Sequence, residues 1–151
     1  MTEDWENGGF GIYIHWPFCT AKCPYCDFNS HVRSNINQKQ WLKAYLNEIK
    51  RVSEKTSNRI LNSVFFGGGT PSLIEPSIIG DVLNEIQKHW KTKNNFEVTL
   101  EANPGSVDAK NFKAYKEAGV NRTSMGIQSL NTKDLKACLL YTSDAADEWI
   151  G

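Results

Sequence analysis

The chain has 151 residues, of which 40% are hydrophobic and 23% charged, a composition typical of one globular domain. Its formal net charge is zero, which argues against a nucleic acid or an anionic membrane as its partner. Residues 1–9 are polar and acidic, so they do not form a signal peptide, and no apolar run is long enough for a transmembrane segment. We therefore expect a cytoplasmic protein whose clustered cysteines bind metal or act in redox chemistry rather than forming disulfides.

Strand and helix patterns alternate along the chain. Strands are indicated by short apolar or alternating runs, and helices by apolar stripes at helical spacing. Proline begins the second helix and glycine ends the third, as is common at those positions. The predicted elements are strands at 11–18, 61–68, 96–104 and 121–129, each followed by a helix, at 38–54, 76–90, 108–119 and from 131 to 137.

This alternation predicts an α/β fold with a parallel sheet, because parallel neighbours need a crossover that is usually helical. The pattern is compatible with a barrel-like sheet or with a doubly wound one. Four βα units would make half of an eight-stranded barrel.

The residues with unusual chemistry follow the predicted strands. Ligands of parallel α/β folds bind at the carboxyl ends of the strands, so features that follow different strands share one edge. This shared position is stronger evidence for a site than any one motif. The features, in strand order, are the cysteines Cys19, Cys23 and Cys26; the turn Gly67–Ser72; Glu101; and Gln128.

Three cysteines with the spacing C-x3-C-x2-C stand on one loop. Thiolates bind soft or borderline metals and iron–sulfur clusters. Three thiolates on a four-iron cluster would leave one iron open for a substrate or cofactor. A structural zinc site is the alternative, with Cys19, Cys23 and Cys26 joined by His15 or His31 as the fourth ligand.

The other features each allow a structural interpretation as well. The glycines of Gly67–Ser72 permit close approach of a ligand to the backbone, although the segment could be only a tight turn. It is no phosphate loop, since the Gly-Lys-Ser/Thr ending is missing. Glu101 and Gln128 could bind a ligand's hydroxyl or ammonium groups, or be solvated residues at strand ends. Tyr13 could belong to the core, and His15 and His31 are most simply structural.

The cysteine motif, followed by a Gly-Gly-Thr-Pro turn after the second strand, resembles the radical SAM superfamily. In that superfamily three cysteines hold a [4Fe–4S] cluster, and S-adenosylmethionine binds the fourth iron. One electron from the cluster cleaves S-adenosylmethionine to a 5′-deoxyadenosyl radical. The resemblance implies that the chain is the N-terminal half, about four βα units, of a full or partial TIM-like barrel.

Longer blocks are similar to the oxygen-independent coproporphyrinogen III oxidase-like group. They are "YIHWPFC", "KCPYCDFNS", "FFGGGTPS", "LEANPGS" and "GVNRTSMGIQS". The dehydrogenase type of this group usually has a further cysteine two residues after the third, where this chain has Phe28. That difference favours the other type, the HemW heme chaperones, which bind heme and pass it to a target protein.

The resemblance implies roles for ten residues. The cluster ligands of the family fall on Cys19, Cys23 and Cys26. Its cofactor contacts fall on Tyr13, Gly68, Gly69, Thr70, Glu101 and Gln128, and Tyr25 would lie against the cluster.

The family pattern ends after Ala137. An arginine that binds the cofactor would stand at position 140, where this chain has Leu140. We expect residues 1–137 to be a truncated radical SAM core. Residues 138–151 resemble translated sequencing-adapter sequence, so we expect a non-native tail in which Cys138 plays no part in the cluster. Family members are more than twice this length, so we expect the fragment to be inactive alone.

Three hypotheses follow. The first is cluster and S-adenosylmethionine binding in a HemW-type heme chaperone, with heme as cargo and a heme-accepting protein as partner. The second is oxidative decarboxylation of a porphyrinogen, which would make the protein an oxidoreductase. The third is a small structural zinc-binding module.

Overall fold

Four parallel strands form the central sheet of the computed structural model, which describes residues 4–21, 26–103, 109–127 and 129–133. The sheet strands are β1 (Phe10–Trp16), β4 (Ile60–Gly68), β5 (Lys91–Ala102) and β6 (Arg122–Met125). A smaller sheet joins β2 (Phe18–Cys19) and β3 (His31–Val32). The helices are α1 (Trp5–Gly8), α2 (Gln38–Thr56), η1 (Pro71–Leu73, a 3-10 helix), α3 (Pro76–His89) and α4 (Ala109–Glu117).

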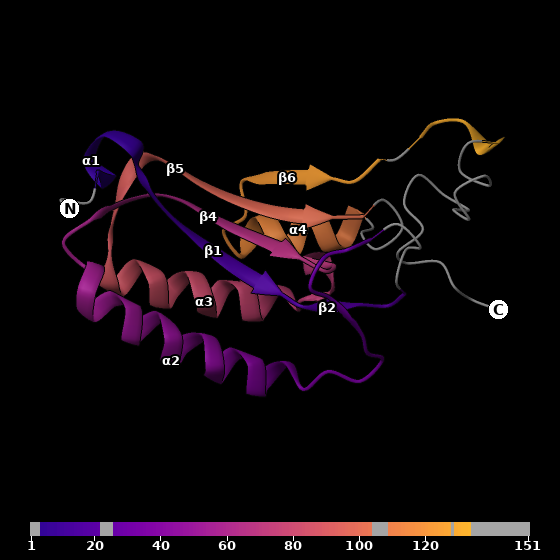
Figure 1. The fold of residues 1–151 in the computed structure, drawn as a ribbon, viewed down its shortest axis with the longest axis horizontal. Coiled ribbons are helices and arrows are strands. Elements are labelled where there is room, and N and C mark those ends of the chain that lie inside the picture. The colour runs from indigo at the N-terminus through magenta and orange to yellow at the C-terminus, as the bar shows by residue number, and fades with distance from the viewer. Residues whose placement is uncertain (1–3, 22–25, 104–108, 128, 134–151) are drawn as a thin grey trace.

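The strand order is β1-β4-β5-β6, which is the order of these strands along the chain. Every neighbouring pair is parallel, and the four arrows run the same way in Figure 1. A doubly wound sheet reverses its strand order at a switch point, whereas a barrel adds each strand beside the last. The structure therefore confirms the α/β prediction and favours the barrel-like arrangement over the doubly wound one.

Helices α2 and α3 lie on one side of the sheet (Figure 1), with α2 packed against α3 and α3 against α4. The sheet side chains that face this layer are buried and apolar, because alternate residues of a strand point to one face. The opposite face carries Tyr13, His15, Phe65, Thr99 and Glu101. The buried core residues of the sheet are Ile14, Trp16, Leu61, Val64, Phe66, Val98, Leu100 and Ala102.

A two-residue parallel pairing closes the base of the cysteine loop. Phe18 pairs with His31 and Cys19 with Val32. The His31 amide donates to the carbonyl of Pro17 (2.7 Å), and the Arg33 amide donates to that of Cys19 (3.3 Å). The sequence did not indicate these short strands. They bring the two ends of the loop together directly after β1.

Two of the strand boundaries that differ from the sequence prediction have a local physical reason. β1 ends at Trp16 rather than at residue 18, because Pro17 has no amide hydrogen for the sheet. β5 begins at Lys91, five residues early, since the polar run Lys91–Asn95 has no apolar alternation to reveal it. Of the predicted fourth helix, only residues 132 and 133 are described, and they are helical. None of the described helices is long and apolar enough to cross a membrane.

A buried tyrosine of α4 makes the folded chain sensitive to alkaline pH. The Tyr115 hydroxyl donates to the carbonyls of Ser72 (2.5 Å) and Ile74 (2.9 Å), and burial raises the pKa of Tyr115 to about 12. The folded state therefore keeps this proton more tightly than the unfolded state, whose tyrosines titrate near 10. The associated stability is complete below pH 10 and is lost as the pH rises through 12.

We expect the wild-type chain to lose about 2 kcal/mol more unfolding free energy than Tyr115→Phe between pH 10 and pH 12. Urea titrations followed by circular dichroism at several pH values measure this difference. Equal losses for the two chains would contradict the prediction. Tyr115→Phe is the suitable comparison because it keeps the ring and removes only the ionising group.

Candidate cofactor site at the carboxyl edge of the sheet

The glycine-rich turn after β4 lies directly against the start of the cysteine loop. The Gly69 amide donates to the carbonyl of Trp16 (2.7 Å), and the Thr70 amide to that of Phe18 (2.8 Å). A β-carbon built on Gly69 would lie 2.5 Å from the Phe18 oxygen and 2.9 Å from the Cys19 sulfur. Only glycine allows this approach. The first predicted cluster ligand and the predicted cofactor loop are therefore in contact.

Gly68 connects this turn to the third strand of the sheet. Its backbone has a φ of 120°, a conformation that favours glycine, and its amide donates to a carboxylate oxygen of Glu101 (3.1 Å). A β-carbon on Gly68 would lie 2.7 Å from the Trp16 carbonyl oxygen and 2.8 Å from the His15 ring. Glu101 is thus oriented by the glycine loop rather than being a freely solvated acid.

Tyr13 lies on the same open face of the sheet as Glu101. Its ring stacks on Phe65 with centroids 6.0 Å apart, and it passes so close to Gly67 that a β-carbon there would lie 2.8 Å from it. Partial burial raises the pKa of the Tyr13 hydroxyl above its ordinary value, and the negative charge of Glu101 raises it further. Because Tyr13 is 57% exposed, it is accessible on this face and is not a core residue.

His15 connects Tyr13 to the cysteine loop, a role that the sequence analysis did not assign to it. Its Nε2 lies 3.0 Å from the carbonyl oxygen of Asn29 and its Nδ1 lies 3.5 Å from the Tyr13 hydroxyl. A carbonyl only accepts, so Nε2 carries the proton and Nδ1 can accept from Tyr13. His15 thereby links Tyr13 to the far end of the cysteine loop. Residues two apart on a strand lie on the same face of the sheet, so the position of His15 after Tyr13 could have indicated that the two side chains are neighbours.

Three buried polar side-chain atoms near the cysteine loop have no hydrogen-bond partner among the described residues: Trp16 Nε1, Ser30 Oγ and Thr70 Oγ1. Thr70 is only 1% exposed. Buried polar atoms nearly always have partners, and each one that lacks a partner needs an explanation. The unpaired hydroxyl of Thr70 stands in the predicted cofactor loop, where a bound polar ligand would satisfy it.

Several predicted site residues lie outside the described part of the chain. These are Cys23, Tyr25 and Gln128, together with the predicted tail at 138–151. Of the remaining cysteines in the loop, Cys19 is buried, Cys26 is partly buried, and neither forms a disulfide. Within the described ranges, which omit Cys23, no three His, Cys, Asp or Glu side chains gather closely enough to hold a metal ion.

The described residues fit the cofactors that the sequence indicates. Cys19 is a free thiol, and its sulfur lies against the backbone of Gly69, which carries no side chain. The adjoining turn carries the Thr70 hydroxyl, which has no partner among the described residues, and the neighbouring strand carries the Glu101 carboxylate, which accepts from the Gly68 amide. A thiol against a backbone without a side chain, with polar groups on the adjoining turn and strand, is compatible with a thiolate-bound cluster that takes a small charged ligand.

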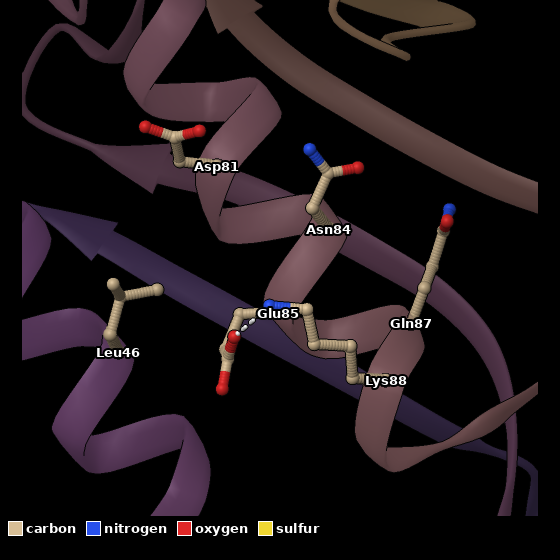
Figure 2. Close-up of a pocket in the computed structure, with 6 residues that line it drawn as sticks. All are labelled: Leu46, Asp81, Asn84, Glu85, Gln87 and Lys88. Atoms are coloured by element: carbon tan, nitrogen blue, oxygen red, sulfur yellow. Dashed lines mark hydrogen bonds and ion pairs between the residues drawn. The ribbon is translucent and has the colours of Figure 1, made fainter.

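A surface hollow lies between α2 and α3, away from the candidate site (Figure 2). Leu46 of α2 faces a polar row on α3, in which the Lys88 ammonium binds the Glu85 carboxylate (2.8 Å). No predicted site residue lines this hollow. Its lining residues are Leu46, Asp81, Asn84, Glu85, Gln87 and Lys88.

The sequence matches the Radical SAM superfamily over residues 13–148. This match covers most of the chain, and it includes all ten residues to which the resemblance assigned roles. The chain belongs to the radical SAM superfamily.

Within the superfamily, the chain is similar to heme chaperones. It is 46% identical over 130 residues to the heme chaperone HemW of Haemophilus influenzae, covering 83% of this chain and 34% of that protein. It is 39% identical over 126 residues to HemW of Escherichia coli, with 83% and 33% covered. The chain therefore spans about a third of the length of these relatives.

A solved structure shares the fold. The coproporphyrinogen III oxidase HemN of Escherichia coli, described as a radical SAM enzyme, superposes with a TM-score of 0.76. The two sequences are 25% identical, and the match covers 85% of this chain and 30% of HemN. Together with the HemW relatives, this match confirms the predicted likeness to the coproporphyrinogen oxidase-like group.

Proposed function

We propose that Cys19, Cys23 and Cys26 hold a [4Fe–4S] cluster and that the same edge of the sheet binds S-adenosylmethionine. The contact between Gly69 and Cys19 is the observation that carries the proposal, because it joins the cysteine loop to the glycine-rich turn. The membership of the chain in the radical SAM superfamily supports both cofactors. When bound, the cluster supplies the electron used to cleave S-adenosylmethionine in enzymes of this superfamily.

The protein's own residues would bind and orient S-adenosylmethionine. Gly68 and Gly69 offer backbone atoms without side chains, and Thr70 offers a buried hydroxyl. Glu101, which the Gly68 amide orients, can accept from an ammonium or a ribose hydroxyl. We propose the same binding role for Tyr13. Tyr25 and Gln128 complete the proposed set.

We further propose that the protein acts as a heme chaperone of the HemW type, with heme as cargo and a heme-accepting protein as recipient. The identities to HemW proteins, 46% and 39%, exceed the 25% identity to HemN and support this choice. Phe28 stands where the dehydrogenase type usually carries a cysteine. The structural match to HemN keeps oxidation of coproporphyrinogen III as the second candidate.

Anaerobic reconstitution of the chain with iron and sulfide tests the cofactor proposal. We expect about four iron atoms per chain and a change in the electron paramagnetic resonance of the reduced cluster when S-adenosylmethionine is added. Binding of one zinc ion, with no cluster absorbance and no response to S-adenosylmethionine, would show a structural zinc site instead.

Titration of the full-length protein with heme, run beside an assay of the same protein for coproporphyrinogen decarboxylation, separates the two candidate functions. A heme chaperone is expected to develop the visible absorbance of bound heme and to release no carbon dioxide from coproporphyrinogen III. Turnover of coproporphyrinogen without heme binding would identify the oxidase type.

A further inference from the structure

The segment that follows the glycine-rich turn is held by side chains from two distant helices. Gln38, the first residue of α2, donates from Nε2 to the carbonyl of Leu73 (3.0 Å) and accepts at Oε1 from the amide of Glu75 (2.8 Å). On the other side, the Tyr115 hydroxyl of α4 donates to the carbonyls of Ser72 and Ile74. Three consecutive carbonyls thus accept from side chains.

These contacts are not local consequences of the turn. Gln38 precedes its partners by 35 and 37 residues, and Tyr115 follows its partners by 43 and 41. Within the segment, the amides of Leu73 and Ile74 bond the carbonyls of Thr70 and Pro71, which form one 3-10 turn. Two side chains therefore fix a turn whose own hydrogen bonds are few.

Burial of apolar residues already anchors the ends of this connection. Ile74 is 2% exposed, and Ile78 and Ile79 at the start of α3 are 5% and 0% exposed. Packing of these side chains holds the connection between β4 and α3 in the core. The hydrogen bonds of Gln38 and Tyr115 then fix the position of the backbone from Ser72 to Glu75.

The turn includes the buried Thr70 hydroxyl, which has no partner among the described residues, and Thr70 directly follows Gly69, whose backbone lies against the Cys19 sulfur. A preformed site binds its ligand more tightly because the free protein has already ordered the groups that touch it. We infer that Gln38 and Tyr115 are positioning residues that preorganise the glycine-rich turn for S-adenosylmethionine without touching it. This inference rests on the proposed function.

The test compares Gln38→Ala, Gln38→Glu and Tyr115→Phe with the wild-type chain. Gln38→Glu keeps an acceptor for the Glu75 amide and loses the donor to Leu73, so it removes half of the contact. Gln40→Ala is the matched control, since Gln40 is exposed on the same helical turn and its side chain makes none of these contacts. Tyr115→Phe keeps the buried ring, so it tests the hydroxyl alone.

The first measurement needs no cofactor. Amide hydrogen exchange at Leu73, Ile74 and Glu75 is expected to accelerate by about fivefold or more in Gln38→Ala and Tyr115→Phe, since each loses hydrogen bonds that hold the turn. Amides in the middle of α3 should exchange as in the wild-type chain. Gln40→Ala should not differ from the wild-type chain.

The second measurement is the dissociation constant for S-adenosylmethionine, obtained by equilibrium dialysis on cluster-loaded chains. It is expected to rise by about five- to tenfold in Gln38→Ala and Tyr115→Phe, and by less in Gln38→Glu, while the iron content stays at the wild-type value.

A wild-type chain that carries a cluster but binds no S-adenosylmethionine would overturn the proposed function and this inference with it. If the wild-type chain binds and Gln38→Ala and Tyr115→Phe bind equally well, the inference alone is wrong. The inference is also wrong if the iron content of those variants falls as much as their affinity for S-adenosylmethionine. Gln38 and Tyr115 would then stabilise the fold as a whole rather than position the turn.

Discussion

Replacing Cys19 with alanine is expected to abolish assembly of the cluster. The wild-type chain, reconstituted without oxygen, should hold about four iron atoms, and Cys19→Ala should fall to background. The reason is geometric: a cluster bound by three thiolates has no protein ligand to spare. Iron and sulfide analysis, with the visible absorbance of the cluster, measures the loss. Cys23→Ala and Cys26→Ala are expected to behave in the same way.

Cys138→Ala is the matched control for these variants. Cys138 is the fourth cysteine of the chain and lies in the predicted tail, outside the described residues. The Cys138→Ala substitution is expected to leave the iron content unchanged. If Cys19→Ala kept the iron content of the wild-type chain, Cys19 would not be a ligand of the cluster. Equal losses in Cys19→Ala and Cys138→Ala would show that reconstitution depends on thiols in general rather than on the loop.

Replacing Gly69 with alanine is expected to damage both the fold and the site. The added methyl group would meet the Phe18 oxygen at 2.5 Å and the Cys19 sulfur at 2.9 Å, distances that side chains do not tolerate. Either β2 or the turn must move, which would lengthen the bonds from Gly69 to Trp16 and from Thr70 to Phe18. We expect a loss of about 2 to 3 kcal/mol of unfolding free energy, the upper part of the range of roughly 1 to 3 kcal/mol for overpacking.

Because Gly69→Ala displaces the backbone beside Cys19, we expect it to lower iron content and S-adenosylmethionine affinity as well. Urea titration measures the stability, and iron analysis with equilibrium dialysis measures the site. Wild-type values in both would mean that the turn and the cysteine loop are not in contact in solution.

Gly80→Ala is the control for the loss of a glycine. Gly80 lies within α3, and a β-carbon there would meet nothing closer than Ala118 at 3.8 Å. Alanine is preferred over glycine inside helices by about 1 kcal/mol, so this variant should be equally or more stable than the wild-type chain. The contrast between the two variants separates the steric effect at Gly69 from a general effect of glycine replacement.

The local features of this protein could be predicted from its sequence. Hydrophobic periodicity predicted the order of strands and helices, since side-chain spacing along a strand or helix is a local property. The cysteine spacing and the glycine-rich turn predicted which residues to examine. Prediction failed where local signals were weak, as in the polar start of β5 at Lys91–Asn95. It also missed the two-residue strands β2 and β3, which exist only as partners of each other.

The contacts that make these features one site depend on residues far apart in the chain. The Gly68 amide bonds Glu101 across 33 positions, and Gln38 and Tyr115 reach the turn from separations of 35 to 43. No periodicity in one segment encodes such pairings. They follow from the strand order β1-β4-β5-β6 and from the helix layer.

The sequence alone thus determined the element order, the candidate ligands and the family resemblance, because each depends on residues that are close together in the sequence. Only the tertiary structure decided that the strands lie in the order β1-β4-β5-β6, that Gly69 touches Cys19, and that His15 joins Tyr13 to the cysteine loop. The physical reason is that close packing and hydrogen bonding between distant segments depend on how the strands and helices are placed against each other.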